Sequence, residues 1–121
     1  MTFFIVDDSA VLRTIVKSTL LSYGYKDTIE AEDGEDALKK FNTLNKKVSL
    51  FILDVNMPNL NGLELLEEIR KKDSKTPIIM LTTESDKEKM ILAKELGATG
   101  WIIKPFDKEK FIKIIEMLIK K

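Results

Sequence analysis

The sequence predicts an α/β domain in which a parallel sheet is covered by helices on both faces. Five short apolar runs, at residues 3–6, 28–31, 50–53, 78–81 and 101–103, alternate with longer segments of helical periodicity. All but the second run are almost continuously apolar, which is typical of strands buried on both faces. A strand followed by a helix, five times over, favours parallel strands joined by helical crossovers.

Signals for the helices occur after each run, in chain order. Ser9, Asp86 and Asp107 stand where a side chain can cap the start of the first, fourth and fifth helices. Gly24 and Gly97 stand just past the expected ends of the first and fourth helices. The expected apolar stripes of the five helices are, in turn, Val11, Leu12, Ile15, Val16, Thr19 and Leu20; Ala37, Leu38 and Phe41; Leu63, Leu65, Leu66 and Ile69; residues 90–96; and Phe111, Ile112, Ile114, Ile115, Leu118 and Ile119.

Length and composition predict one globular domain and exclude several classes of function. The chain has 121 residues, of which 44% are hydrophobic, so a single core can form. Lys plus Arg and Asp plus Glu both number 20, and this zero net charge argues against direct nucleic-acid binding. The absence of Cys and His excludes disulfides, thiolate metal sites and a phosphohistidine. With no signal peptide and no membrane span, we expect a cytoplasmic protein that does not bind membranes.

Polar side chains that could carry chemistry follow four of the five predicted strands. Asp7 and Asp8 follow the first strand and Asp54 follows the third, while Thr82 ends the fourth and Lys104 follows the fifth. The carboxyl ends of parallel strands share one edge of a sheet, where open α/β sheets bind ligands, so we expect these groups to converge. Three clustered carboxylates repel one another, and a bound Mg²⁺, or Mn²⁺ in its place, would relieve the repulsion.

This cluster is suited to phosphoryl transfer. A carboxylate can attack phosphorus to form an aspartyl phosphate, and positioning and charge neutralisation supply most of the catalysis. In this interpretation Asp54 is the attacking group, Asp7 and Asp8 hold the metal, and Thr82 and Lys104 contact the phosphoryl oxygens. Each residue alone has an ordinary explanation as a helix cap or loop residue. Their combination at one edge of the sheet favours a functional site.

The strand ends carry four motifs that resemble the receiver domain of bacterial response regulators. They are DDS from Asp7, LDVNMPNLNG around Asp54, LTTE around Thr82 and KPF from Lys104. The resemblance covers residues 1–121 as one receiver domain and is nearest to the single-domain chemotaxis (CheY-like) type. It implies a flavodoxin-like (βα)5 fold with strand order 2-1-3-4-5. It also implies a two-component role, in which a sensor histidine kinase phosphorylates the Asp in the second motif.

The resemblance implies roles for residues around the metal and the phosphoryl group. Asp8, Asp54 and the main-chain carbonyl of Asn56 would bind the metal directly, and Asp7 would act mainly through a metal-bound water. Asn56 and Glu84 occupy positions that tune hydrolysis in this family. Their identities predict relatively rapid self-dephosphorylation.

The resemblance also implies how a signal leaves the site. Thr82 and Lys104 match the switch pair of the family, and the Lys104–Pro105 bond is expected to be cis. Trp101 stands where family members usually carry Tyr, Phe or His, so its larger indole could swing between two positions or pack in one. The expected partner surface combines the fourth helix, fifth strand and fifth helix, with Met90 and Trp101 as candidate contact residues.

The implied partners are two proteins. Part of the apolar stripe that includes Val11, Leu12 and Ile15 could dock the helical bundle of the kinase, or the stripe could be wholly buried. The sequence ends at Lys121, directly after the last predicted helix. We therefore expect an output through binding to another protein, such as a flagellar motor switch component.

Other functions use the same motifs. The chain could be a phosphorelay intermediate that passes phosphate from Asp54 to a His-containing phosphotransferase, or a receiver domain cut from a larger regulator. An enzyme of the Asp-x-Asp phosphatase type is disfavoured because Asn56 stands two positions after Asp54, and no GxxxxGK[ST] loop is present. A flavodoxin-like cofactor binder is disfavoured because Asp7 and Asp8 would repel a flavin phosphate. We expect catalysis only of the protein's own phosphorylation and dephosphorylation.

Overall fold

The computed structural model describes residues 1–120 as alternating strands and helices, and Lys121 lies outside the described residues. No helix in the described part of the chain is long and apolar enough to cross a membrane. Strand bounds differ by at most one residue from the predicted runs. The elements are β1 (Thr2–Val6), α1 (Ala10–Ser22), β2 (Asp27–Ala31), α2 (Gly34–Thr43), β3 (Leu50–Leu53), α3 (Gly62–Lys72), β4 (Ile78–Thr82), α4 (Lys87–Leu96), β5 (Gly100–Ile103) and α5 (Lys108–Ile119).

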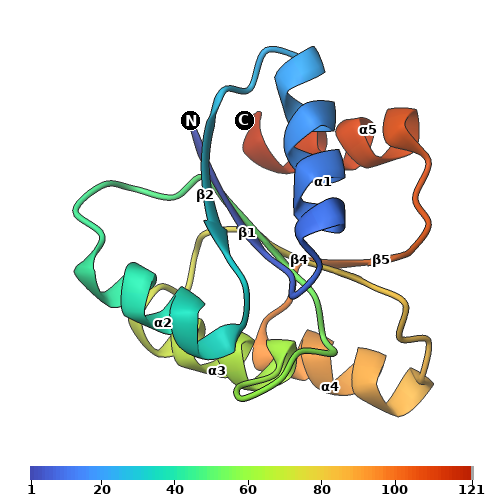
Figure 1. The fold of residues 1–121 in the computed structure, drawn as a ribbon. Coiled ribbons are helices and arrows are strands. Elements are labelled where there is room, and N and C mark those ends of the chain that lie inside the picture. Colours follow the sequence, from blue (N-terminus) through green and yellow to red (C-terminus); the bar gives the residue numbers. More distant parts are fainter. Residues whose placement is uncertain (121) are drawn as a thin grey trace.

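The five strands are all parallel and lie in the order β2-β1-β3-β4-β5, which confirms the predicted topology. In the centre of the sheet, the register sets Phe3 beside Leu50 and Val6 beside Leu53. At one edge, β2 is partly exposed, which explains its lower apolar content. Helices α1 and α5 cover one face of the sheet, and α2, α3 and α4 cover the other (Figure 1).

Each face of the sheet buries its own core, because neighbouring residues of a strand point to opposite faces. Phe3 packs in the core that includes Leu20 of α1 and Phe111 of α5. The next residue, Phe4, packs in the other core with Leu66 of α3. Both faces need apolar side chains, and this requirement explains the nearly continuous apolar runs in the sequence.

The predicted helix ends are confirmed. Side chains of Ser9, Asp86 and Asp107 cap α1, α4 and α5 by accepting hydrogen bonds from backbone N–H groups of the first turn. Gly97 ends α4 with φ of 106°, a left-handed conformation that glycine adopts at little cost. Gly24, just after α1, also has a positive φ of 91°. These signals set where each helix starts and where the chain turns back to the sheet.

Some residues of the expected apolar stripes are exposed, so the core covers only part of each of these stripes. On α4, Ile91 and Leu92 are 59% and 43% exposed, whereas Ala93 is buried. Successive residues of a helix are about 100° apart, so three in a row cannot all face the core. On α1, Val11 is 68% exposed and Ile15 is also exposed. On α5, Ile114 is exposed, and the other residues of the predicted stripe are buried or half-buried.

Candidate functional site

The predicted polar groups converge at the carboxyl ends of the strands. Carboxylate oxygens of Asp7, Asp8 and Asp54 all lie within 4.8 Å of one another. Asp7 and Asp54 are buried at 5% and 6% exposure, and Asp8 is exposed. Thr82, at the end of β4, is fully buried. Two carboxylates are thus held in the protein interior while the third faces solvent.

Lys104 provides a positive charge within this cluster. Its Nζ donates to Asp7 Oδ2 at 2.7 Å and to Asp54 Oδ2 at 3.4 Å. The Lys104 side chain is only 11% exposed, so these ion pairs are shielded from bulk water. The Lys104–Pro105 peptide bond is cis, as the resemblance implies. The ion pairs with Asp7 and Asp54 show that the Lys104 side chain lies over the strand ends and not in solvent.

Backbone groups of the loops orient the two buried carboxylates. The N–H of Ser9 donates to Asp7 Oδ1 at 2.9 Å, and the N–H of Asn56 donates to Asp54 Oδ1 at 3.3 Å. Each carboxylate thus has one oxygen turned to its own loop and the other turned to Lys104. This arrangement fixes the rotamers of both side chains around the site.

Gly62 and Arg13 support the site and were not singled out by the sequence. A Cβ at Gly62 would lie 1.9 Å from the backbone carbonyl oxygen of Asp54, so only glycine allows this approach of α3. A glycine directly after the helix-capping Asn61 is an unusual placement, and this feature of the sequence could have identified Gly62. Arg13 donates to the backbone carbonyl of Asp7 and to Glu30. No sequence pattern marks that contact.

The electrostatics of Asp54 are set by burial and by its neighbours. Burial raises the pKa of the Asp54 carboxyl, the Thr82 hydroxyl and the Lys104 ammonium lower it, and the adjacent Asp7 raises it. The net shift is upward. A carboxylate held ionised in this environment gains from any further positive charge, which is what a divalent cation supplies.

The donor set fits a hard divalent cation. Three carboxylates offer oxygen ligands, and Mg²⁺ prefers oxygen ligands while keeping some of its waters. Asp8 and Asn56 both line a cavity of about 400 Å³ beside the cluster, so the exposed side of the site is open to solvent and ligands. The residues expected to hold a metal therefore lie together on an accessible side of the sheet edge.

A chain of hydrogen bonds links Thr82 to Trp101. The backbone N–H of Glu84 donates to Thr82 Oγ1 at 3.2 Å, and the indole N–H of Trp101 donates to the backbone carbonyl of Glu84 at 3.1 Å. The Glu84 side chain also pairs with Lys89 at 2.9 Å. Glu84 is therefore the one residue between the Thr82 hydroxyl and the half-buried Trp101 indole. If the hydroxyl moves, the Glu84 backbone and the indole can move with it.

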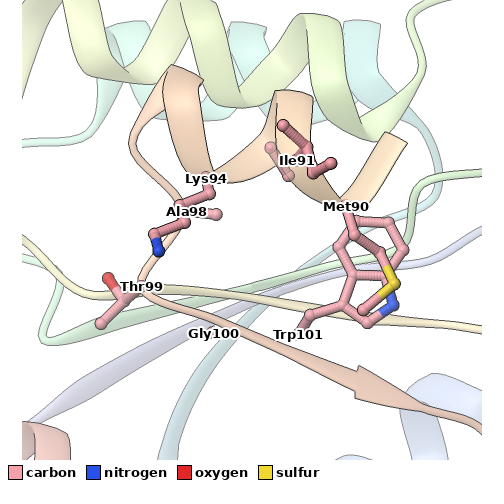
Figure 2. A pocket seen from close by; sticks show the side chains of 8 residues that line it. Met90, Ile91, Lys94, Ala98, Thr99, Gly100 and Trp101 are labelled. Atoms are coloured by element: carbon pink, nitrogen blue, oxygen red, sulfur yellow. The ribbon is translucent and has the colours of Figure 1, made fainter. Parts of the chain in front are cut away.

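A cavity of about 360 Å³ lies between α4 and β5 (Figure 2). Met90 and Trp101, the two expected contact residues, lie at one end of it, and Lys94 and Thr99 lie at the other. Its lining is mainly apolar, with Ile91 exposed beside it. The two residues predicted as a partner surface thus line one cavity next to the loop whose Glu84 contacts both Thr82 and Trp101.

Comparison with a family model and with curated relatives gives consistent matches. The model of the family described as response regulator receiver domain matches residues 3–116. Chemotaxis protein CheY1 of Helicobacter pylori is 38% identical over 121 residues, which cover 98% of this chain and 97% of the relative. A chemotaxis protein CheY homolog of Campylobacter jejuni is 44% identical over 108 residues, covering 88% and 82% of the two chains.

Solved structures show the same fold in similar proteins. Chemotaxis protein CheY4 of Vibrio cholerae has a TM-score of 0.87 and 38% identity, with 97% of each chain covered. A response regulator receiver domain protein of Clostridium thermocellum has a TM-score of 0.89 and 26% identity, covering 98% and 93% of the two chains. Both similarities extend over nearly all of the chain.

Proposed function

Because the chain belongs to the response regulator receiver domain family, we propose that it is a chemotaxis-type response regulator switched by phosphorylation of Asp54. The observation that carries this proposal is the convergence of Lys104 with the carboxylates of Asp7, Asp8 and Asp54. Residues 1–121 would act as one receiver domain. A cytoplasmic location stays a prediction from the sequence.

The same residues divide the chemistry of phosphoryl transfer. Asp8, Asp54 and the main-chain carbonyl of Asn56 would hold Mg²⁺ or Mn²⁺, with Asp7 acting mainly through a bound water. The metal supplies positive charge that balances the phosphoryl oxygens when it is bound. An Asp54 carboxylate oxygen attacks phosphorus, and the bond from phosphorus to the donor breaks. Lys104 neutralises a further phosphoryl oxygen as a point charge.

Hydrolysis returns the site to its starting state. A water attacks the phosphorus, inorganic phosphate leaves and the Asp54 carboxylate is restored. Asn56 and Glu84 would set the rate of this step, because both lie at the outer side of the site, in the loops that follow β3 and β4. In this proposal the protein catalyses its own phosphorylation and dephosphorylation.

The signal would leave through the loop between β4 and α4. When the Thr82 hydroxyl turns to a phosphoryl oxygen, the Glu84 N–H loses its acceptor. The carbonyl of the same residue holds the Trp101 indole, so the position of this ring changes with the loop. The hollow lined by Met90 and Trp101 would then bind its target differently in the two states. By likeness to the chemotaxis relatives, the target would be a flagellar motor switch component.

The sensor histidine kinase would approach from the side of α1. Val11 and Ile15 are exposed on this helix, so the alternative of a wholly buried stripe is not what the fold contains. Ile15 also lines an apolar cavity of about 330 Å³ together with Leu12, Lys104 and Phe106. An apolar face next to Lys104 suits the helical bundle of a sensor histidine kinase, which would bring its phosphohistidine to Asp54.

The test uses Trp101, the only tryptophan, as a reporter. Beryllofluoride, a mimic of the phosphoryl group, is added with Mg²⁺ while the tryptophan fluorescence is recorded. We expect a saturable change in the wild type that requires Mg²⁺ and is absent in Asp54→Asn. Asp27→Asn, which makes the same change at the exposed start of β2, serves as the control and should respond like the wild type. A response retained in Asp54→Asn would contradict the proposal.

A further inference from the structure

Lys89 of α4 forms an ion pair that spans the loop after β4. Its Nζ lies 2.9 Å from Glu84 Oε1, and the side chains of Lys89 and Glu84 are 43% and 20% exposed. The second carboxylate oxygen of Glu84 accepts from the backbone N–H of Asp86, so the carboxylate is held in place. The ammonium is thus fixed next to the loop that contacts Thr82.

Lys89 also lines the cavity of about 400 Å³ whose other walls include Asp8, Asn56, Pro58 and Leu63. This cavity is the mouth of the site. Asp8 belongs to the carboxylate cluster, and Asn56 follows Asp54 by two residues. The long side chain therefore places a positive charge in the same solvent-open cavity as the exposed carboxylate of Asp8.

Without Lys89, negatively charged side chains would outnumber positively charged ones around this mouth. Among residues 1–120, the carboxylates of Asp7, Asp8, Asp54 and Glu84 lie at this edge of the sheet. Lys104 is already paired with two of them in the interior. Lys89 offsets the charge of Glu84, and without it a negatively charged donor would meet an additional uncompensated carboxylate on its way in.

We propose that Lys89 is a specificity-determining residue that favours the more negatively charged small-molecule phosphodonors at this site. The inference rests on the proposed function, because it concerns donors that transfer a phosphoryl group to Asp54. An Asp54 oxygen attacks the donor phosphorus. The P–O bond to acetate breaks with acetyl phosphate and the P–N bond breaks with phosphoramidate, which releases ammonia. At neutral pH acetyl phosphate is a dianion and phosphoramidate a monoanion, so they differ in charge while delivering the same group.

The experiment compares phosphorylation rates of Lys89→Met with both donors in the presence of Mg²⁺. Coulomb's law in a largely solvated mouth predicts a loss of roughly three- to tenfold with acetyl phosphate. The loss with phosphoramidate should be about the square root of that factor, since the donor carries half the charge. Lys89→Arg should keep the wild-type preference, and the effect of Lys89→Met should shrink in 0.5 M salt, where the screening length is only about 4 Å.

Two controls separate this role from a structural one. Lys87→Met removes the same charge from an exposed position on α4 and should leave both rates unchanged. The double variant Glu84→Gln with Lys89→Met removes both charges and should recover the wild-type ratio of the two rates. Equal losses with both donors, or no loss in Lys89→Met, would overturn the inference while the proposed function stands. Failure of the wild type to accept phosphate from either donor would overturn both.

Discussion

The Lys104 ammonium lies 2.7 Å from Asp7 Oδ2, although the two residues are 97 positions apart in the chain. The same ammonium is 3.4 Å from Asp54 Oδ2. Lys104 thus binds Asp7 more closely than it binds the proposed phosphoacceptor. The longer distance leaves Asp54 able to bind another cation in place of Lys104. A metal ion could then take the place of the ammonium beside Asp54, while Lys104 turns to a phosphoryl oxygen.

Lys104→Met should strengthen Mg²⁺ binding. The ammonium repels a cation bound at the carboxylates, and its removal also leaves the buried Asp7 and Asp54 without a positive neighbour. We expect Mg²⁺ affinity to rise roughly tenfold, measured by isothermal titration calorimetry. Lys108→Met, the same charge change at an exposed position of α5, should have little effect. Weaker Mg²⁺ binding in Lys104→Met would show that the ammonium helps to build the metal site.

Asp54→Asn should stabilise the metal-free protein at neutral pH. Burial raises the pKa of this carboxyl in the folded state, so its contribution to stability is present when it is protonated and is lost as the pH rises through the folded pKa. Lys104 keeps Asp7 as a partner in the variant, so no charge is left unpaired. We expect the free energy of unfolding to increase by about 1 kcal/mol at pH 7.

The pH dependence provides the control for this prediction. Below about pH 3.9, the ordinary pKa of an aspartate, Asp54 is protonated in both the folded and unfolded states, and the gain should vanish. Urea unfolding in EDTA at pH 7 and pH 3.5 measures both values. A variant that is less stable than the wild type at pH 7 would contradict the account of Asp54 as a carboxylate that burial disfavours.

Gly62→Ala should destabilise the fold and disturb the site. The added Cβ would clash with the backbone carbonyl of Asp54, which cannot rotate away as a side chain could. We expect a loss of about 2–3 kcal/mol in the free energy of unfolding, measured with urea. Gly100→Ala is the matched control, because a Cβ there would meet only the Ile79 side chain at 4.0 Å. Equal stability of the two variants would argue against the close approach of α3.

The lifetime of the phosphorylated protein should be short and should depend on Asn56 and Glu84. Both follow the strands that carry Asp54 and Thr82, and the Asn56 side chain contributes to the lowered pKa of Glu84 after Lys89 and the Asp86 backbone. Decay of the phosphoprotein is followed after removal of the donor in the wild type, Asn56→Ala and Glu84→Ala. We expect a change of roughly tenfold in at least one variant. Slow decay that is identical in all three proteins would exclude a tuning role.

The edge of the sheet that carries the site is predictable from sequence. Each strand is marked by an apolar run, and Asp7, Asp54 and Lys104 follow such runs directly. Parallel strands then bring their carboxyl ends together whatever the length of the crossover. Helix starts are predictable for a similar reason, because capping by Ser9 or Asp107 involves backbone groups only a few positions away.

Contacts between segments that are distant or that lack a repeating pattern are not predictable in this way. Nothing in the sequence pairs Lys89 with Glu84, because their contact depends on how the loop turns into α4. The exposure of Ile91 depends on which side of α4 the sheet covers, and the apolar pattern alone does not define that side. The close packing of Gly62 likewise follows from the path of a loop in three dimensions.

The most direct measurement is the intact mass of the protein after incubation with Mg²⁺ and acetyl phosphate. We expect a gain of a single phosphoryl group in the wild type, no gain when EDTA replaces Mg²⁺, and no gain in Asp54→Asn. Asp86→Asn, at an exposed helix cap, should be phosphorylated like the wild type. An unmodified wild-type protein, under conditions that modify another receiver domain, would show that Asp54 is not a phosphoacceptor.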